Sequence, residues 1–236
     1  MLRSLKSMME YALKAEDGDI GSVIDFFFDD AEWKMRFMQA DTGGWLQGKK
    51  VLISPESIGN IDWRDMKVPV NLSKDKIRES PEFKFADPMR RPQWEMICKY
   101  YGWNVDWYNS SATLRSLNQV SSYKIHARDG MLGNIDDMIL EDETWTIRYF
   151  VVDISGLLFG KKVLMSPQWV DEFVDEGKEV RLDVMKDKVK SSPIYDPDKP
   201  INREYEAVVF DYMGKPSYWR DVKSSQKKNA AGKTTK

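Results

Sequence analysis

The chain has very few of the residues that build metal, redox and nucleophilic sites. Its 236 residues include one cysteine, Cys98, and one histidine, His126. A single cysteine cannot form an intrachain disulfide, and one Cys with one His falls short of the four ligands of a structural zinc site. We therefore expect no catalytic residue, no metal and no cofactor, and so not an enzyme. The low cysteine usage fits a reduced, cytoplasmic environment.

Long apolar runs and an excess of one charge are also lacking. No run approaches the roughly 20 apolar residues that span a bilayer, and the first residues contain no apolar core of a secretory signal. The net charge of −2 is too small to predict a nucleic-acid partner or strong membrane attraction. A composition of 42% hydrophobic and 31% charged residues is typical of a soluble globular protein without stable membrane insertion.

What the chain does contain is an internal repeat. Leu-Arg-Ser-Leu occurs at 2–5 and again at 114–117, and the same shift of 112 positions aligns GKKVLISP (48–55) with GKKVLMSP (160–167). Roughly a third of the aligned pairs are identical without a gap, which indicates a tandem duplication. We predict repeat one at 2–108, a linker at 109–113, repeat two at 114–220, and a disordered basic tail at 221–236. Because the linker is short, we expect the two repeats to behave as one unit.

Repeat two has the alternation and turn residues of short β-strands. The predicted strands are 122–127, 132–140, 144–153, 161–166, 168–174 and 178–184. Asp-Gly pairs predict tight turns with positive φ at Gly18 and Gly130. Strands at this spacing, without helices between them, predict a small antiparallel barrel. A proline-rich connector then leads to a helix from Arg203 to about Met213, with Asn202 as its cap and Gly214 as its stop. The predicted fold is mainly β: two tandem small antiparallel β-barrels, each followed by a connector and a short α-helix.

Two stretches carry a family resemblance. DGMLGNIDDMILEDETWTIRYFVVD (129–153) with GKKVLMSP, and DGDIGSVIDFFFDDAEWKMRFMQAD (17–41) with GKKVLISP, resemble the PRC-barrel family. This is the small barrel shared by the cytoplasmic domain of the photosynthetic reaction centre H subunit and the C-terminal domain of the ribosome maturation factor RimM. The chain looks most like bacterial proteins with two such domains in tandem.

The resemblance implies a non-catalytic adaptor that docks a protein or ribonucleoprotein partner. Two alternatives stay open: an RNA-binding or ribosome-assembly factor, and an accessory protein of photosynthetic reaction-centre or electron-transport assembly. The chain lacks the membrane helix of the H subunit and the extra N-terminal barrel of RimM. A tandem arrangement suits an adaptor because linked surfaces raise the effective concentration of the second contact.

The candidate partner-binding residues are aromatic and arginine side chains. Trp33 with Arg36, and Trp145 with Arg148, lie around the third strand of each repeat. In one interpretation the tryptophans pack in the barrel and the arginines are exposed. In the other, these residues form a docking edge, because Trp and Arg are common anchors of protein interfaces. A second, denser group of aromatic residues is expected either to pack between the two repeats or to form a docking surface for a partner or for a second copy of the chain. Its members are Trp94, Tyr100, Tyr101, Trp103, Trp107, Tyr108 and the matched Trp219.

Other polar features favour structural interpretations. His126 lies in a predicted strand, where a structural histidine is more common than a catalytic one. Cys98 lies on a predicted helix and is expected in the apolar core. The acidic stretches 29–32 and 141–143 are expected to be solvated turns, since they lack the spacing of an EF-hand loop.

Overall fold

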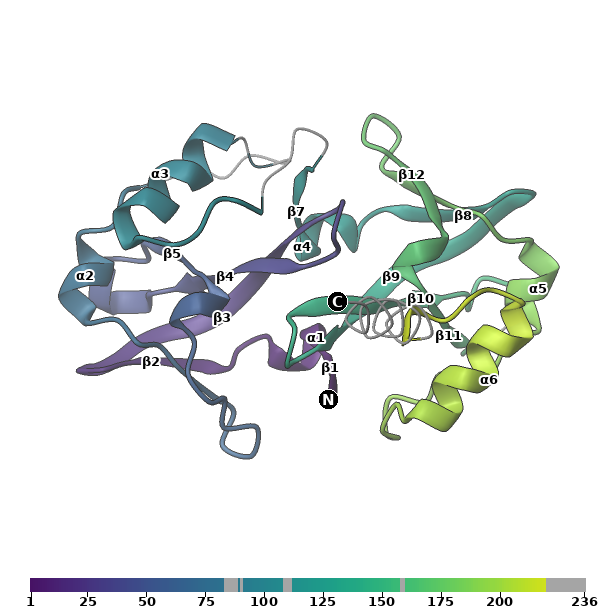
Figure 1. Ribbon diagram of the computed structural model, residues 1–236, viewed down its shortest axis with the longest axis horizontal. Helices are drawn as coiled ribbons and strands as arrows, with labels where there is room; N and C mark the ends of the chain where they lie inside the picture. The colour runs from purple at the N-terminus through teal and green to yellow at the C-terminus, as the bar shows by residue number, and fades with distance from the viewer. Residues whose placement is uncertain (83–88, 90, 108–111, 158–159, 220–236) are drawn as a thin grey trace, which may run out of the picture.

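The structure, a computed structural model, describes residues 1–82, 89, 91–107, 112–157 and 160–219 (Figure 1). It is mainly β and is organised around two sheets that form two lobes of an elongated molecule. The linker prediction at 109–113 falls largely outside the described residues, as do Tyr108 and the predicted tail. No helix in the described ranges is long and apolar enough to cross a membrane.

The first sheet has the hydrogen-bonded order β5-β4-β3-β2-β6, with β7 pairing β3 outside this path. Its strands are β2 (Ala12–Ala15), β3 (Gly18–Asp29), β4 (Met35–Asp41), β5 (Lys50–Ile53), β6 (Lys67–Pro69) and β7 (Leu114–Ser116). The long β3 supplies much of the apolar core, because Phe26, Phe27 and Phe28 are all buried.

The second sheet has the order β11-β10-β9-β8-β13-β12, with β1 pairing β9. Its strands are β1 (Leu2–Ser4), β8 (Lys124–Ala127), β9 (Gly130–Glu141), β10 (Thr146–Asp153), β11 (Lys162–Met165), β12 (Val170–Val174) and β13 (Glu179–Leu182). All six strands predicted for repeat two are therefore present, with ends shifted by a few residues.

The prediction of purely antiparallel sheets is wrong at two matched places. β2 pairs with β6, and β8 pairs with β13, in parallel. The hydrogen-bonded strand order does not close on itself in either sheet of the described chain. In repeat one, the segment that aligns with β12 makes only isolated bridges at Ile58 and Asp62. The two-barrel arrangement therefore remains a prediction.

The helix predicted from Arg203 to about Met213 is present with those bounds. α6 (Arg203–Met213) begins after Asn202, whose side chain accepts a hydrogen bond from the Tyr205 amide, and ends at the left-handed Gly214. Its counterpart is α3 (Arg91–Tyr101). The shorter helices are α1 (Leu5–Met8), α2 (Lys74–Arg78), α4 (Leu117–Val120) and α5 (Lys186–Lys190). Gly18 and Gly130 both have a φ of 142°, which confirms the predicted positive φ at both turns.

The hydrophobic core is continuous across the two repeats. One cluster of buried side chains contains Leu13 and Ile20 of repeat one together with Ile125 and Phe150 of repeat two. Apolar burial is the main stabilising contribution to folding, so a shared core joins the stability of the two halves. This supports the expectation that the repeats behave as one unit.

Candidate functional site

Each sheet receives one strand from the other repeat. In Figure 1, β1 and α1 reach the second lobe, whereas β7 and α4 lie against the first. The register pairs Leu2 with Glu141, and Leu114 with Asp29. Both partners of the second pair are 112 positions from those of the first, so the exchange is reciprocal and symmetrical. The sequence predictions missed both strands, although their identical Leu-Arg-Ser-Leu sequence was the first sign of the repeat.

A buried carboxylate holds each exchanged segment. Asp137 on β9 accepts hydrogen bonds from the Ser4 hydroxyl at 2.5 Å and from the Lys6 amide at 2.9 Å. Its counterpart Asp25 on β3 accepts them from the Ser116 hydroxyl at 2.5 Å and the Asn118 amide at 3.1 Å. Burial raises the pKa of both carboxyl groups, and their hydrogen bonds act in the opposite direction.

The acidic turns bind the exchanged strands, so the expectation of solvated turns is wrong for Asp30 and Asp142, although Glu32 and Glu143 are exposed. Asp30 accepts a hydrogen bond from Arg115 of β7 at 2.6 Å, and Asp142 accepts one from Arg3 of β1 at 3.2 Å. Asp29 is buried and pairs with Arg36 at 2.6 Å. Each acidic turn therefore has one carboxylate that pairs with an arginine of the other repeat, Asp30 or Asp142.

The predicted docking residues Trp33 and Trp145 lie at the seam between the repeats. Each has a left-handed backbone conformation at the tip of a strand hairpin, with a φ of 58° for Trp33 and 55° for Trp145. The Met35 amide donates to the Trp145 carbonyl at 2.8 Å, and the Ile147 amide donates to the Trp33 carbonyl at 2.7 Å. The Trp33 ring lies 5.1 Å from the ring of Phe150, centroid to centroid. These contacts place both tryptophans in packing between the repeats.

The predicted arginines are paired rather than free on the surface. Arg36 is 12% exposed, pairs with Asp29 and lies 4.4 Å above the Trp107 ring. Arg148 pairs with Glu141 and lies 4.3 Å above the Tyr218 ring. Each arginine thus joins the acidic turn of its own repeat to the aromatic segment that follows the helix.

The aromatic segment around α3 packs mainly on the sheet of its own repeat, together with Leu114 of the exchanged β7. Trp94 and Trp103 are buried against Phe27, Phe37 and Leu52 of repeat one. The Trp107 ring lies 4.8 Å from that of Trp94, and Tyr101 stacks on Trp103 at 4.2 Å. Trp219 packs against Phe210 of α6 in the same way. The role of these residues in binding a partner stays a prediction.

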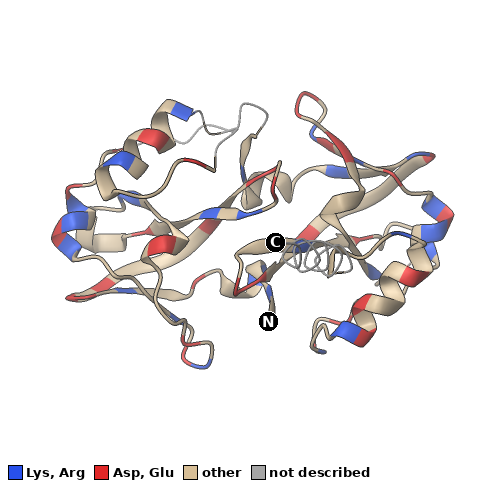
Figure 2. Ribbon diagram, in the orientation of Figure 1, with Lys and Arg blue, Asp and Glu red and all other residues tan. Residues whose placement is uncertain are grey.

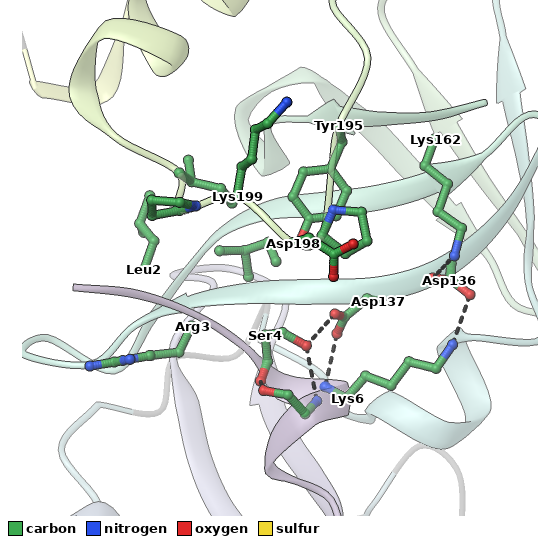
Figure 3. A pocket seen from close by; sticks show the side chains of 15 residues that line it. Leu2, Arg3, Ser4, Lys6, Asp136, Asp137, Lys162, Tyr195, Asp198 and Lys199 are labelled. Carbon is green, nitrogen blue, oxygen red and sulfur yellow. Dashed lines mark hydrogen bonds and ion pairs between the residues drawn. The ribbon is translucent and has the colours of Figure 1, made fainter. Parts of the chain in front are cut away.

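A cavity of about 560 Å³ opens beside the exchanged β1 and α1 (Figure 3). Its walls come from repeat one at β1 and α1, and from repeat two at β9, β11 and the connector after α5. The Lys6 and Lys162 ammonium groups each donate to Asp136 at 2.8 Å, so one carboxylate fixes two cations. This pairing lowers the pKa of Asp136, although its partial burial opposes the shift.

The Tyr195 hydroxyl faces this cavity. The side chain is 9% exposed and points into the cavity, and its hydroxyl makes no hydrogen bond within the described ranges (Figure 3). Burial, with Asp137 and Asp136 nearby, raises its pKa to about 12, so the phenol is protonated at neutral pH. A protonated phenol is a hydrogen-bond donor for a ligand.

The polar residues of this cavity are not repeated at the positions that align with them. At the positions that align with Lys6, Asp136 and Tyr195, the chain has Asn118, Ile24 and Phe83. Two charges and a hydroxyl are therefore missing from the corresponding sequence around repeat one. The two repeats therefore differ in the residues near the exchanged strands, although the strand exchange itself is symmetrical.

The remaining predicted residues have structural surroundings. His126 on β8 lies 3.7 Å from a carboxylate oxygen of Glu179. Cys98 is buried in the α3 cluster, and burial raises its pKa to about 12, which disfavours the reactive thiolate. Within the described ranges, no group of three or more His, Cys, Asp or Glu side chains is arranged to hold a metal ion.

Comparison with known proteins adds no assignment. No protein-family model matches the chain, and no curated protein matches it either.

Proposed function

We propose that the chain is a non-catalytic adaptor of two PRC-barrel-like repeats that binds a protein or ribonucleoprotein partner. The observation that carries this proposal is the cavity with the Tyr195 hydroxyl. Its wall combines apolar side chains such as Leu2, Ile139 and Pro200 with the charged Asp198 and Lys199. Apolar surface with a few placed polar groups suits a segment of a partner protein, since apolar contact supplies affinity and polar contacts fix orientation.

The fused seam supports the adaptor function. Strand exchange, the shared core and the arginine–carboxylate pairs connect the two repeats in many places. A rigid joint keeps surfaces of both repeats in a constant relation. A partner that contacts both lobes then loses less conformational freedom on binding than it would with a flexible linker.

Affinity capture with matched variants tests the proposal. We expect wild-type chain to retain a specific protein or ribonucleoprotein from a lysate of its source, and Asp198→Lys to lose it. Asp198 lines the cavity and is exposed, so the change should alter binding and leave the fold intact. Glu204→Lys, an exposed change on α6, is the control and should retain the partner. Equal retention by both variants would remove the cavity from the proposal.

A direct RNA contact is the second candidate. Figure 2 shows Lys and Arg gathered on α2 and α5, toward opposite ends of the molecule. Two separated basic helices can contact phosphates on one extended RNA. Retention of RNA on a filter that weakens steeply between low and moderate salt would support this candidate, because phosphate contacts release bound counterions. Salt-independent or absent retention would favour a protein partner.

A further inference from the structure

We propose that residues 1–8 form an exchangeable arm that docks on β9 of a second copy of this chain. Two chains would then form a dimer by trading arms. In the monomer the arm consists of β1 and α1, and it already lies on the sheet of the other repeat. The dimer uses the same contacts, made between chains rather than within one.

The end of β9 binds the arm through contacts that do not depend on chain connection. Strand pairing aligns Leu2–Ser4 with β9, Asp142 pairs with Arg3, and Asp137 binds Ser4. Leu5 and Met8 of α1 are fully buried in the shared core. Addition of a strand to a sheet edge, with side-chain pockets for register, is a general mode of protein recognition.

The occupant is a second copy because this chain carries the matching sequence. The same Leu-Arg-Ser-Leu segment pairs with the equivalent end of β3, in the same register and with the equivalent carboxylate Asp25. The fold therefore contains this contact twice in a symmetrical arrangement. An exchange between two chains repeats that arrangement, and closed symmetry of this kind is the usual basis of swapped dimers.

The connection between the arm and β2 is a strained hinge. Glu10 has a φ of 70°, a left-handed conformation that is unfavourable for a residue other than glycine. Its counterpart Ser122 is not among the residues with positive φ in the described ranges. An arm that extends to another chain frees Glu10 from this conformation. Short strained hinges favour domain swapping, so the geometry selects the first arm rather than β7.

The burial of the two segments points the same way. All three residues of β1 are partly exposed, whereas all three residues of β7 are buried. Release of β1 therefore uncovers less surface than release of β7. The segment with the strained hinge is also the one that is easier to detach.

Disulfide trapping in the full chain tests the exchange. Leu2 and Glu141 are paired between β1 and β9, so the double variant Leu2→Cys and Glu141→Cys should oxidise wherever the arm is docked. After refolding at high concentration, we expect a covalent dimer on a non-reducing gel. The matched control, Leu114→Cys with Asp29→Cys, should give an intrachain bond and a monomer. The buried Cys98 is common to both variants.

A second measurement covers the case in which a cysteine variant does not fold. Isotopically heavy and light wild-type chains are refolded together and examined by native mass spectrometry. Mixed dimers are expected, and Glu10→Gly should lower their fraction several-fold because glycine relieves the hinge in the monomer. Ser122→Gly should leave the fraction unchanged. Monomers alone at every concentration, or equal effects of the two glycine variants, would overturn the proposal.

Discussion

Replacement of Asp137 by alanine probes the exchange most directly. Asp137 accepts three hydrogen bonds, and two of them, from Ser4 and Lys6, cross between the repeats. A hydrogen bond to a charged group contributes about 1.5–3 kcal/mol, so loss of the two crossing bonds costs about 3–6 kcal/mol. Burial raises the pKa of this carboxyl, which means that its ionised form is unfavourable and that its removal returns part of this loss. We expect a net destabilisation of about 2–4 kcal/mol.

Urea unfolding followed by tryptophan fluorescence measures the change. The matched variant Asp25→Ala should lose a similar amount, because Asp25 accepts the equivalent bonds from Ser116 and Asn118. The exposed Asp171 on β12 provides the control, and Asp171→Ala should change the free energy of unfolding by less than about 0.5 kcal/mol. If Asp137→Ala unfolds at the same urea concentration as Asp171→Ala, the carboxylate does not hold the arm and the reasoning fails.

Three further predictions follow from burial and packing. Asp25 and Asp137 have pKa values raised above 3.8 in the folded protein. As the pH falls through these raised values, both carboxyl groups take up a proton in the folded state, and the free-energy cost of burying their charge disappears. Wild type should therefore gain stability relative to the Asp25→Asn, Asp137→Asn double variant between pH 7 and 4 in urea titrations, and a falling difference would contradict this. Gly133→Ala should destabilise by more than about 2 kcal/mol, because a Cβ there would lie 1.8 Å from a backbone oxygen, whereas Gly156→Ala has open space; equal thermal midpoints would refute the close approach. Cys98 should react with iodoacetamide only after unfolding, since its thiol is buried with a pKa of about 12, and rapid labelling of the native protein would show an open α3 cluster.

Local signals in the sequence were sufficient for β8 to β13 and for α6 of repeat two, but not for β7 and α4. Alternating apolar residues predicted β10 and β13, and a capping asparagine with a stopping glycine predicted α6. These signals depend on only a few neighbouring residues, and the predicted elements are present in the structure. The parallel pairings of β2 with β6 and β8 with β13 join strands that are not neighbours in sequence, and no local pattern specifies such partners.

The exchange could not be predicted for a different reason. The segments 2–5 and 114–117 are identical, so each fits either sheet and sequence alone does not choose between them. The sequence nevertheless contained a signal for the carboxylates that bind the exchanged segments. Asp25 and Asp137 interrupt apolar stretches at aligned positions, and a carboxylate repeated in a predicted buried strand indicates a specific polar partner. The Tyr195 cavity had no such sign, because its walls come from distant parts of the chain.

The strand exchange also determines the order in which the chain can fold during synthesis. The sheet of repeat one receives β7 from residues 114–116, soon after its own strands have emerged. The arm at residues 1–8 has to wait for β9, which ends at Glu141. Until then Leu5 and Met8 have no sheet to pack against, so these apolar side chains stay uncovered while the residues up to Glu141 are synthesised. Nascent chains that carry exposed apolar arms on neighbouring ribosomes are prone to mispairing, and a chaperone that shields residues 1–8 during this interval would protect the native pairing.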